Sequence, residues 1–170
     1  MAFRHPDQAA IALGIDPGAN GALVFLAANG DVLAIEDTPS ITVKVGKTNR
    51  TRVASAALAS LIRERMPVHA FVENVGAMPS QGAASMFAFG KAAGIVEGAL
   101  AGLRIPVTFI TPQAWKKAAG IGADKGHARR RAMELFPGWA DLFLRAKDDG
   151  RAEAALIAWH GLQSMRAVPG

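Results

Sequence analysis

Residues 11–25 read IALGIDPGANGALVF, and this stretch decides the fold class. An apolar run ends in one acid, Asp16, which Pro17-Gly18 follow. A second apolar run begins at Gly21. The pattern predicts a hairpin of two short strands with an acid at the end of the first. A carboxylate in apolar surroundings is costly to desolvate unless a cation meets it. Because a solvated turn is the commoner role of Asp before Pro, the case for a metal site depends on acids further along the chain.

The composition fits one domain. The chain has 170 residues, of which 51% are apolar, and it has no cysteine. We therefore expect a single domain over 1–170, with loose tails at 1–10 and 166–170 and without disulfides or thiolate metal sites. No apolar run is long enough to span a bilayer, and the first residues lack the apolar core of a signal peptide. These features favour a cytoplasmic protein with no membrane partner.

Positive charge is in excess and is clustered. The formal net charge is +5, and the basic residues fall in three segments that flank the acids discussed below. Clustered basic charge is typical of a polyanionic partner such as DNA. The clusters are Lys44, Lys47, Arg50 and Arg52; Lys116 and Lys117; and Lys125, Arg129, Arg130 and Arg131.

The order of elements predicts an α/β fold. Apolar runs and turn residues predict strands at 11–16, 21–27, 31–36, 68–72 and 107–110, and helical spacing predicts helices at 53–66, 80–103, 113–119, 124–136 and 149–165. Residues 38–52 are polar and basic, and we expect a mobile loop there. Strand–helix–strand crossovers place the later strands parallel to the first. The expected architecture is a ribonuclease H-like, mixed five-stranded sheet flanked by helices on both faces.

Four acids are expected at one edge of this sheet. Asp16 and Glu73 end two strands that we expect to be parallel neighbours, so their carboxylates emerge together. Asp149 and Glu153 are four residues apart and share one face of the last helix, where like charges repel unless a cation neutralises them. Such a cluster suits Mg²⁺, with Mn²⁺ as a substitute. Two ions about 4 Å apart would activate a water and stabilise the leaving oxygen of a phosphodiester.

Each acid also has a structural alternative. Glu73 precedes Asn74 and could simply end its strand, Asp149 is a good helix N-cap, and Glu153 could be an exposed helix residue. Asp148 is an equally good cap, so the choice between Asp148 and Asp149 stays open. The joint occurrence of all four acids at the ends of elements favours the metal site.

Other residues have a possible role in DNA binding. Met86, Phe87 and Phe89 open the helix over 80–103 and are either core residues or an apolar wedge beside unstacked bases, with Phe87 the preferred candidate. The basic segment over 44–52 is expected to grip phosphates without reading sequence. Gly90, Gly94 and Gly98 predict close backbone packing and make this helix a candidate dimer surface. The candidate DNA contacts are Lys44, Lys47, Arg50, Arg52, Phe87, Lys117 and Arg129.

Several motifs, in this order, resemble the RuvC-type Holliday junction resolvases, closest to the branch of phage, bacterial and chloroplast enzymes. They are Gly-Ile-Asp-Pro-Gly at 14–18, Val-Glu-Asn at 72–74 and Lys-Asp-Asp-Gly-Arg-Ala-Glu-Ala-Ala-Leu at 147–156. Support comes from Ser-Met-Phe-Ala-Phe-Gly at 85–90 and from Pro-Gln-Ala-Trp-Lys at 112–116 leading into Gly-Ile-Gly-Ala-Asp-Lys at 120–125. The resemblance covers residues 11–161, and the combined set is far more specific than Gly-x-Asp-x-Gly alone.

The resemblance implies a metal-dependent crossover junction endodeoxyribonuclease that cuts four-way DNA junctions as a homodimer. Asp16, Glu73, Asp149 and Glu153 match the four acidic metal ligands of that family. Lys116 and Lys125 match basic positions near the scissile phosphate, although their spacing differs from that of the best-known bacterial members. Many resolvases have Asp or His followed by Asp three residues later, whereas here the spacing is four and the second acid is the longer Glu. A branch-migration motor is a further partner that the sequence leaves open, and the expected location is the cytoplasm of a bacterial cell or of a phage-infected host.

Two other functions fit parts of the sequence. The same acids could serve another ribonuclease H-like nuclease that cuts branched DNA or RNA–DNA hybrids, because fold alone does not choose the substrate. The hairpin at 14–18 also resembles the first phosphate loop of actin-like ATPases and sugar kinases. Those proteins need a second phosphate loop and an adenosine site, and neither motif is visible here.

Overall fold

The computed structural model describes residues 11–74, 76, 82–122 and 124–167. The expected tail at 1–10 and the last three residues lie outside this part. Residues 166–167 do not form a loose tail as predicted, because they belong to the last helix, where the guanidinium of Arg166 donates a hydrogen bond to the carbonyl oxygen of Ala28. Among the described residues, none of the helices combines the length and apolar character needed to cross a bilayer.

A five-stranded mixed sheet with the order β3-β2-β1-β6-β7 forms the centre of the fold. The strand β1 (Ala12–Ile15) pairs antiparallel with β2 (Ala22–Leu26), which pairs antiparallel with β3 (Val32–Asp37). On its other side β1 pairs parallel with β6 (His69–Glu73), and β6 pairs parallel with β7 (Val107–Ile110). The predicted strands and their directions are therefore confirmed.

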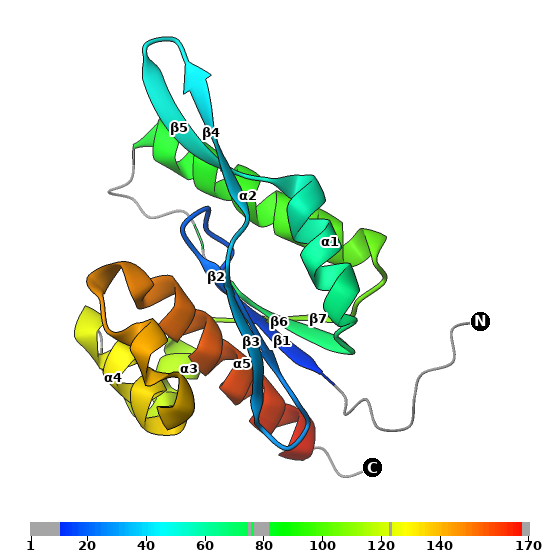
Figure 1. Ribbon diagram of the computed structural model, residues 1–170, viewed down its shortest axis with the longest axis vertical. Helices are drawn as coiled ribbons and strands as arrows, with labels where there is room; N and C mark the ends of the chain where they lie inside the picture. Colours follow the sequence, from blue (N-terminus) through cyan, green and yellow to red (C-terminus); the bar gives the residue numbers. More distant parts are fainter. Residues whose placement is uncertain (1–10, 75, 77–81, 123, 168–170) are drawn as a thin grey trace.

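Helices cover both faces of the sheet, as predicted. The helices α1 (Ser55–Arg65) and α2 (Ala83–Gly102) lie on one face, and α5 (Asp149–Ala167) crosses the other (Figure 1). The helices α3 (Pro112–Ala119) and α4 (Lys125–Leu135) pack against α5. Alternate residues of β1 enter the two cores, with Leu13 and Ile15 in the core under α1 and α2 and Ala12 in the core under α5. Two 3-10 helices that the sequence did not predict, Pro137–Phe143 and Ala146–Asp148, connect α4 to α5.

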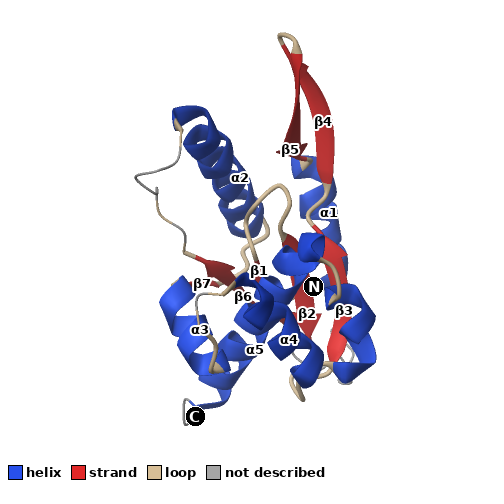
Figure 2. Ribbon diagram, turned by 90° about the vertical axis from the view of Figure 1, so that its left-hand side faces the viewer, coloured by secondary structure: helices blue, strands red, loops and turns tan. Residues whose placement is uncertain are grey.

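The prediction of an irregular loop over 38–52 is wrong. This segment forms a two-stranded hairpin, β4 (Ser40–Val45) and β5 (Thr48–Val53), which projects away from the main sheet (Figure 2). The β-branched residues Ile41, Val43 and Val45 alternate with polar ones, which is a strand pattern. Gly46 adopts a positive φ of 61° in the two-residue turn, a backbone conformation that glycine reaches without strain. The charges of the segment obscured this alternation.

Close packing of α5 on β1 needs a residue without a side chain at Gly14. A β-carbon there would collide with the carbonyl oxygen of Ala154 and the backbone nitrogen of Ala158, both in the middle of α5. By contrast, a β-carbon at Gly138 would meet no atom within 4 Å. The position of α5, and with it that of Asp149 and Glu153, depends on this contact.

We predict that Gly14→Ala lowers the free energy of unfolding by about 1–3 kcal/mol, because the helix must shift away from the strand. The matched control Gly138→Ala should be neutral within about 0.5 kcal/mol. Urea unfolding of both variants measures the difference. Equal stability of the two variants would show that α5 does not depend on Gly14 for its position.

Candidate active site

Two acids emerge side by side at one edge of the sheet. The register pairs Ile15 of β1 with Val72 of the parallel strand β6, so the residues that follow, Asp16 and Glu73, are neighbours at the carboxyl ends of their strands. The Asp16 carboxylate accepts a hydrogen bond of 3.3 Å from the backbone N–H of Gly18, which fixes it inside the turn. The expected placement of this pair is confirmed.

The start of α5 packs directly on Asp16. A β-carbon built on Gly150 would lie 3.1 Å from Asp16 Oδ2 and 2.8 Å from the carbonyl oxygen of Asn20. Glycine at position 150 thus allows the helix to begin in contact with the carboxylate. Asp149 and Glu153 flank this contact point by one residue and by three, which brings all four acids to the same region.

Burial and the charges of neighbouring acids raise the pKa of two of these acids. Burial raises the pKa of Glu153 to about 7, and the charges of Asp16, Glu73 and Asp149 add to the effect. Burial and the charge of Glu73 raise the pKa of Asp16 to about 6, although the Gly18 N–H opposes the shift. Without a cation, close carboxylates therefore hold protons at a pH where isolated ones would have lost them.

Trp115 orients Glu73 and was missed by the sequence analysis as a functional residue. Its indole Nε1–H donates a 2.9 Å hydrogen bond to Glu73 Oε1, and both side chains are buried. Burial raises the pKa of Glu73, while this hydrogen bond and the charge of Lys116 lower it. The indole fixes the carboxylate of Glu73 in one direction. A buried Trp needs an acceptor for its N–H. The position of Trp115 beside the predicted site residue Lys116 was the signal in the sequence that could have indicated its role.

The structure distinguishes the adjacent acids Asp148 and Asp149. Asp148 is only 2% exposed, and Arg145 binds both of its oxygens, with Nε and Nη2 at 3.0 and 2.9 Å. This contact lowers the pKa of Asp148. Both acids line a cleft together with Asp16 and Glu153, but the side chain of Asp149 is 36% exposed and Arg145 does not bind it. Asp148 therefore fixes the connection into α5, and Asp149 is the acid that remains open to the cleft.

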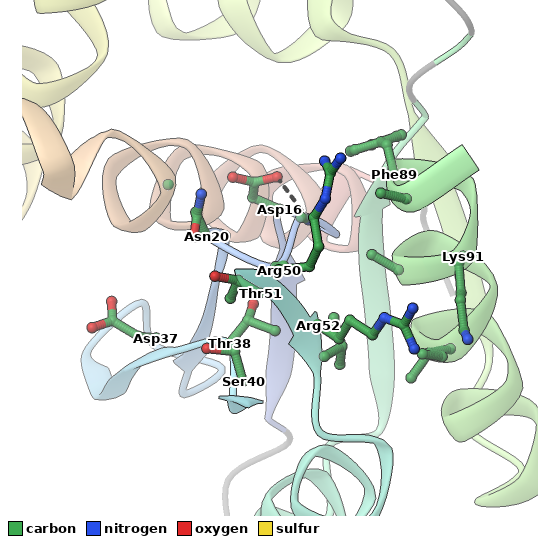
Figure 3. A pocket seen from close by; sticks show the side chains of 18 of the residues that line it. Asp16, Asn20, Asp37, Thr38, Ser40, Arg50, Thr51, Arg52, Phe89 and Lys91 are labelled. Atoms are coloured by element: carbon green, nitrogen blue, oxygen red, sulfur yellow. Dashed lines mark hydrogen bonds between the residues drawn. The ribbon is translucent and has the colours of Figure 1, made fainter. Parts of the chain in front are cut away.

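The cleft has a volume of about 1350 Å³, and residues of the hairpin and of the first turns of α2 line it (Figure 3). Arg50 and Arg52 line it, and in the hairpin register they share a face with Val43 and Ile41. Lys44 lies on the opposite face, where it pairs with Asn49, and Lys47 lies in the turn. Only two of the four basic residues predicted in this segment thus line the cleft.

The remaining predicted residues fall in different places. Lys116 lies close enough to the acids for its charge to lower the pKa of both Glu73 and Glu153. Lys117 is exposed on α3, and Arg129 turns inward toward Asp149. The side chain of Lys125 lies outside the described part of the structure.

Phe87 is a surface residue. It is 75% exposed and lines the cleft from α2, so the alternative that it belongs to the core is excluded. Phe89, two residues further, also lines the cleft and is half-buried. An aromatic ring without apolar cover, next to arginines, is typical of a surface that meets bases.

The donor set fits a hard divalent cation. Four carboxylates, two of them with a strongly raised pKa, present only oxygen ligands, and Asp149 Oδ1 is buried without a hydrogen-bond donor among the described residues. Oxygen-only sites of this kind suit Mg²⁺ or Mn²⁺. Within the same part of the chain, no three acidic or histidine side chains are already grouped as they would be around an ion. Binding would therefore require small movements of these side chains.

Comparisons with known proteins agree on the fold. No protein-family model matches the sequence, and no curated protein matches it. Among solved structures, T. thermophilus RuvC in complex with a Holliday junction substrate matches 93% of this chain and 96% of its own, with a TM-score of 0.67 and 19% identity. A second structure of Thermus thermophilus RuvC matches 93% of this chain and 97% of its own, with a TM-score of 0.57 and 17% identity. The chain is an α/β protein with the ribonuclease H-like fold. More narrowly, its fold is that of RuvC.

We predict different effects for Asp148→Asn and Asp149→Asn. The first should lower the free energy of unfolding by about 1–3 kcal/mol, because it replaces a buried oxygen that accepts hydrogen bonds from Arg145 with a donor. The second should change stability little, since it relieves repulsion among the acids but also removes the charge that faces Arg129, and should weaken Mn²⁺ binding at least about tenfold. Thermal unfolding with and without Mn²⁺ measures both effects. Loss of Mn²⁺ binding in Asp148→Asn alone would transfer the ligand role to Asp148.

Proposed function

We propose that this protein is a metal-dependent endonuclease that resolves four-way DNA junctions by paired phosphodiester hydrolysis in a homodimer. The observation that carries the proposal is the gathering of Asp16, Glu73, Asp149 and Glu153 in one region. Three of these acids, Asp16, Asp149 and Glu153, line a cleft that Arg50 and Arg52 also line. The likeness to RuvC in complex with a Holliday junction substrate supports this substrate class. The resemblance of the sequence motifs supports it independently, and implies a bacterial or phage-infected cytoplasm as the location.

The four carboxylates would hold Mg²⁺, with Mn²⁺ as a substitute. When bound, such ions supply a water activated for attack and charge stabilisation for the leaving oxygen. Trp115 keeps Glu73 directed toward the site through its indole N–H. Lys116 brings positive charge beside Glu73 and Glu153, where the phosphate charge would lie. Lys125 is proposed to act near the same phosphate on the sequence resemblance alone.

Arg50 and Arg52 would grip the phosphates of the strand that enters the cleft. They share a hairpin face with Ile41 and Val43, so the wall that meets DNA is both cationic and apolar. Phe87, on the α2 side of the cleft, would insert beside bases that are unstacked at the crossover. These contacts suit an opened junction better than a continuous duplex.

A second copy of the chain would supply the second cut. Two symmetric sites match the two-fold symmetry of a four-way junction, which favours a homodimer. The face of α2 that carries Gly90, Gly94 and Gly98 is exposed, and β-carbons at these positions would meet no atom within 4 Å. The close packing predicted from their spacing thus does not occur within the described part of the chain. We propose that this face lies against the partner's α2.

Asp16→Asn should abolish cutting and preserve binding. Metal-ion stabilisation of the transition state is worth several kcal/mol, so we expect cleavage of a synthetic four-way junction in Mg²⁺ to fall at least about 10³-fold. Junction affinity, measured by gel shift, should change less than about threefold, because the phosphate contacts remain. Cutting at an equal rate by both proteins would remove Asp16 from the mechanism.

The substrate is tested on the wild-type protein. A mobile four-way junction, a linear duplex and an RNA–DNA hybrid of the same sequence are compared under the same conditions. Paired cuts in opposing strands of the junction support the proposal. Faster cleavage of the hybrid would instead identify another ribonuclease H-like nuclease.

Changing the two hairpin arginines that line the cleft should lower the salt dependence of junction binding. For Arg50→Ala/Arg52→Ala we expect the slope of log affinity against log salt to fall by about 2, since each phosphate contact contributes about 0.9. The matched control is Lys44→Ala, on the opposite face of the same hairpin, which should change the slope by less than about 0.5. A larger effect of Lys44→Ala would place DNA on the other face.

A further inference from the structure

Arg129 points into the protein, although the sequence predicts that it contacts DNA. Its side chain is 21% exposed, whereas that of its neighbour Arg130 is 57% exposed. The guanidinium Nε lies 3.4 Å from Asp149 Oδ1. The helix α4 packs against α5, so Arg129 of α4 contacts the first turn of α5 from within the protein.

The contact is an ion pair without a closed hydrogen bond. Asp149 Oδ1 and Arg129 Nη1 are both buried, and neither has a hydrogen-bond partner among the described residues. A buried polar atom without a hydrogen bond is energetically unfavourable. The packing of α4 against α5 would therefore not by itself favour placing these two atoms here. Asp149 lines the cleft and Arg129 does not, so the carboxylate stands between the guanidinium and the cleft.

We propose that Arg129 is a positioning residue that holds the carboxylate of Asp149 from behind and keeps it directed toward Glu153 and the cleft. The guanidinium also offsets part of the negative charge that the four acids collect. Arg129 does not touch the junction. The proposal rests on the proposed function, since it assumes that Asp149 is a metal ligand.

This role resembles that of outer groups at metal sites, which orient the ligands and whose removal costs 10- to 100-fold in metal affinity or activity. Three neighbouring arginines therefore have different roles. Arg131 is paired with Glu134 on the same helix, and Arg130 lies near Asp124 at the surface. Only Arg129 reaches an acid of the site.

The test measures Mn²⁺ binding to the full chain without DNA, by calorimetry and by the rise in melting temperature with Mn²⁺. Arg129→Gln should weaken Mn²⁺ binding about 10- to 100-fold, and Arg129→Lys, which keeps the charge, should recover part of the loss. The control Arg130→Gln should bind Mn²⁺ as the wild type does. Metal-free junction affinity should change less than about threefold in Arg129→Gln.

Each contrary result has a definite meaning. Unchanged or tighter Mn²⁺ binding by Arg129→Gln would overturn the positioning role, and so would a loss of metal-free junction affinity with Mn²⁺ binding intact. If Arg129→Gln does not fold, Arg129→Lys is measured in its place. We then expect Mn²⁺ binding at least about threefold weaker than that of the wild type. Mn²⁺ binding equal to that of the wild type would overturn the proposal. The variant Asp149→Asn distinguishes a failure of the positioning role from a failure of the proposed metal site. If Asp149→Asn binds Mn²⁺ as the wild type does, the proposed metal site itself is wrong.

Discussion

The direct contact between the backbone of α5 and the face of the central strand β1 is the constraint on which the site depends. Glycines at both surfaces make it possible: Gly14 faces the middle of the helix, and Gly150 lies against the carboxylate of Asp16. A side chain at either position would hold the helix away from the sheet. Helix and strand can then bring acids from opposite ends of the chain into one cluster that no local segment could form.

Collecting four carboxylates has an electrostatic cost, and the structure divides its acids accordingly. Behind the site, Asp148 is bound by Arg145 and also lies 3.6 Å from Arg151, so its charge is neutralised within the protein. At the cleft, Asp16 and Glu153 have raised pKa values because burial and like charges dominate their surroundings. The paired acid stabilises the turn into α5, and the poorly paired acids are available to a cation. Asp148 and Asp149 are adjacent residues of the same type, and only their surroundings distinguish them.

Most of the sheet and the placement of Asp16 and Glu73 could be predicted from the sequence, because apolar runs that end in an acid carry both strand and site signals. The hairpin could not, since Arg50, Arg52 and Lys44 mask an alternation that is clear in Ile41, Val43 and Val45. The inward turn of Arg129 was equally hidden: three successive arginines on a helix look alike until the packing of α4 on α5 is known. The same holds for Trp115, whose partner Glu73 is 42 residues away in sequence.

One ion pair links the hairpin to the part of the protein that holds the acids. Arg151, between Asp149 and Glu153 in α5, donates two hydrogen bonds of 2.6 Å to the carboxylate of Asp37, three residues before the hairpin begins. Parallel Arg–carboxylate bonds fix orientation as well as distance. The chain just before the hairpin is therefore held in a fixed position relative to the first turn of α5. Under the proposed function, a DNA strand bound by Arg50 and Arg52 would thereby lie at a defined distance from the acids, as cutting at one phosphate requires.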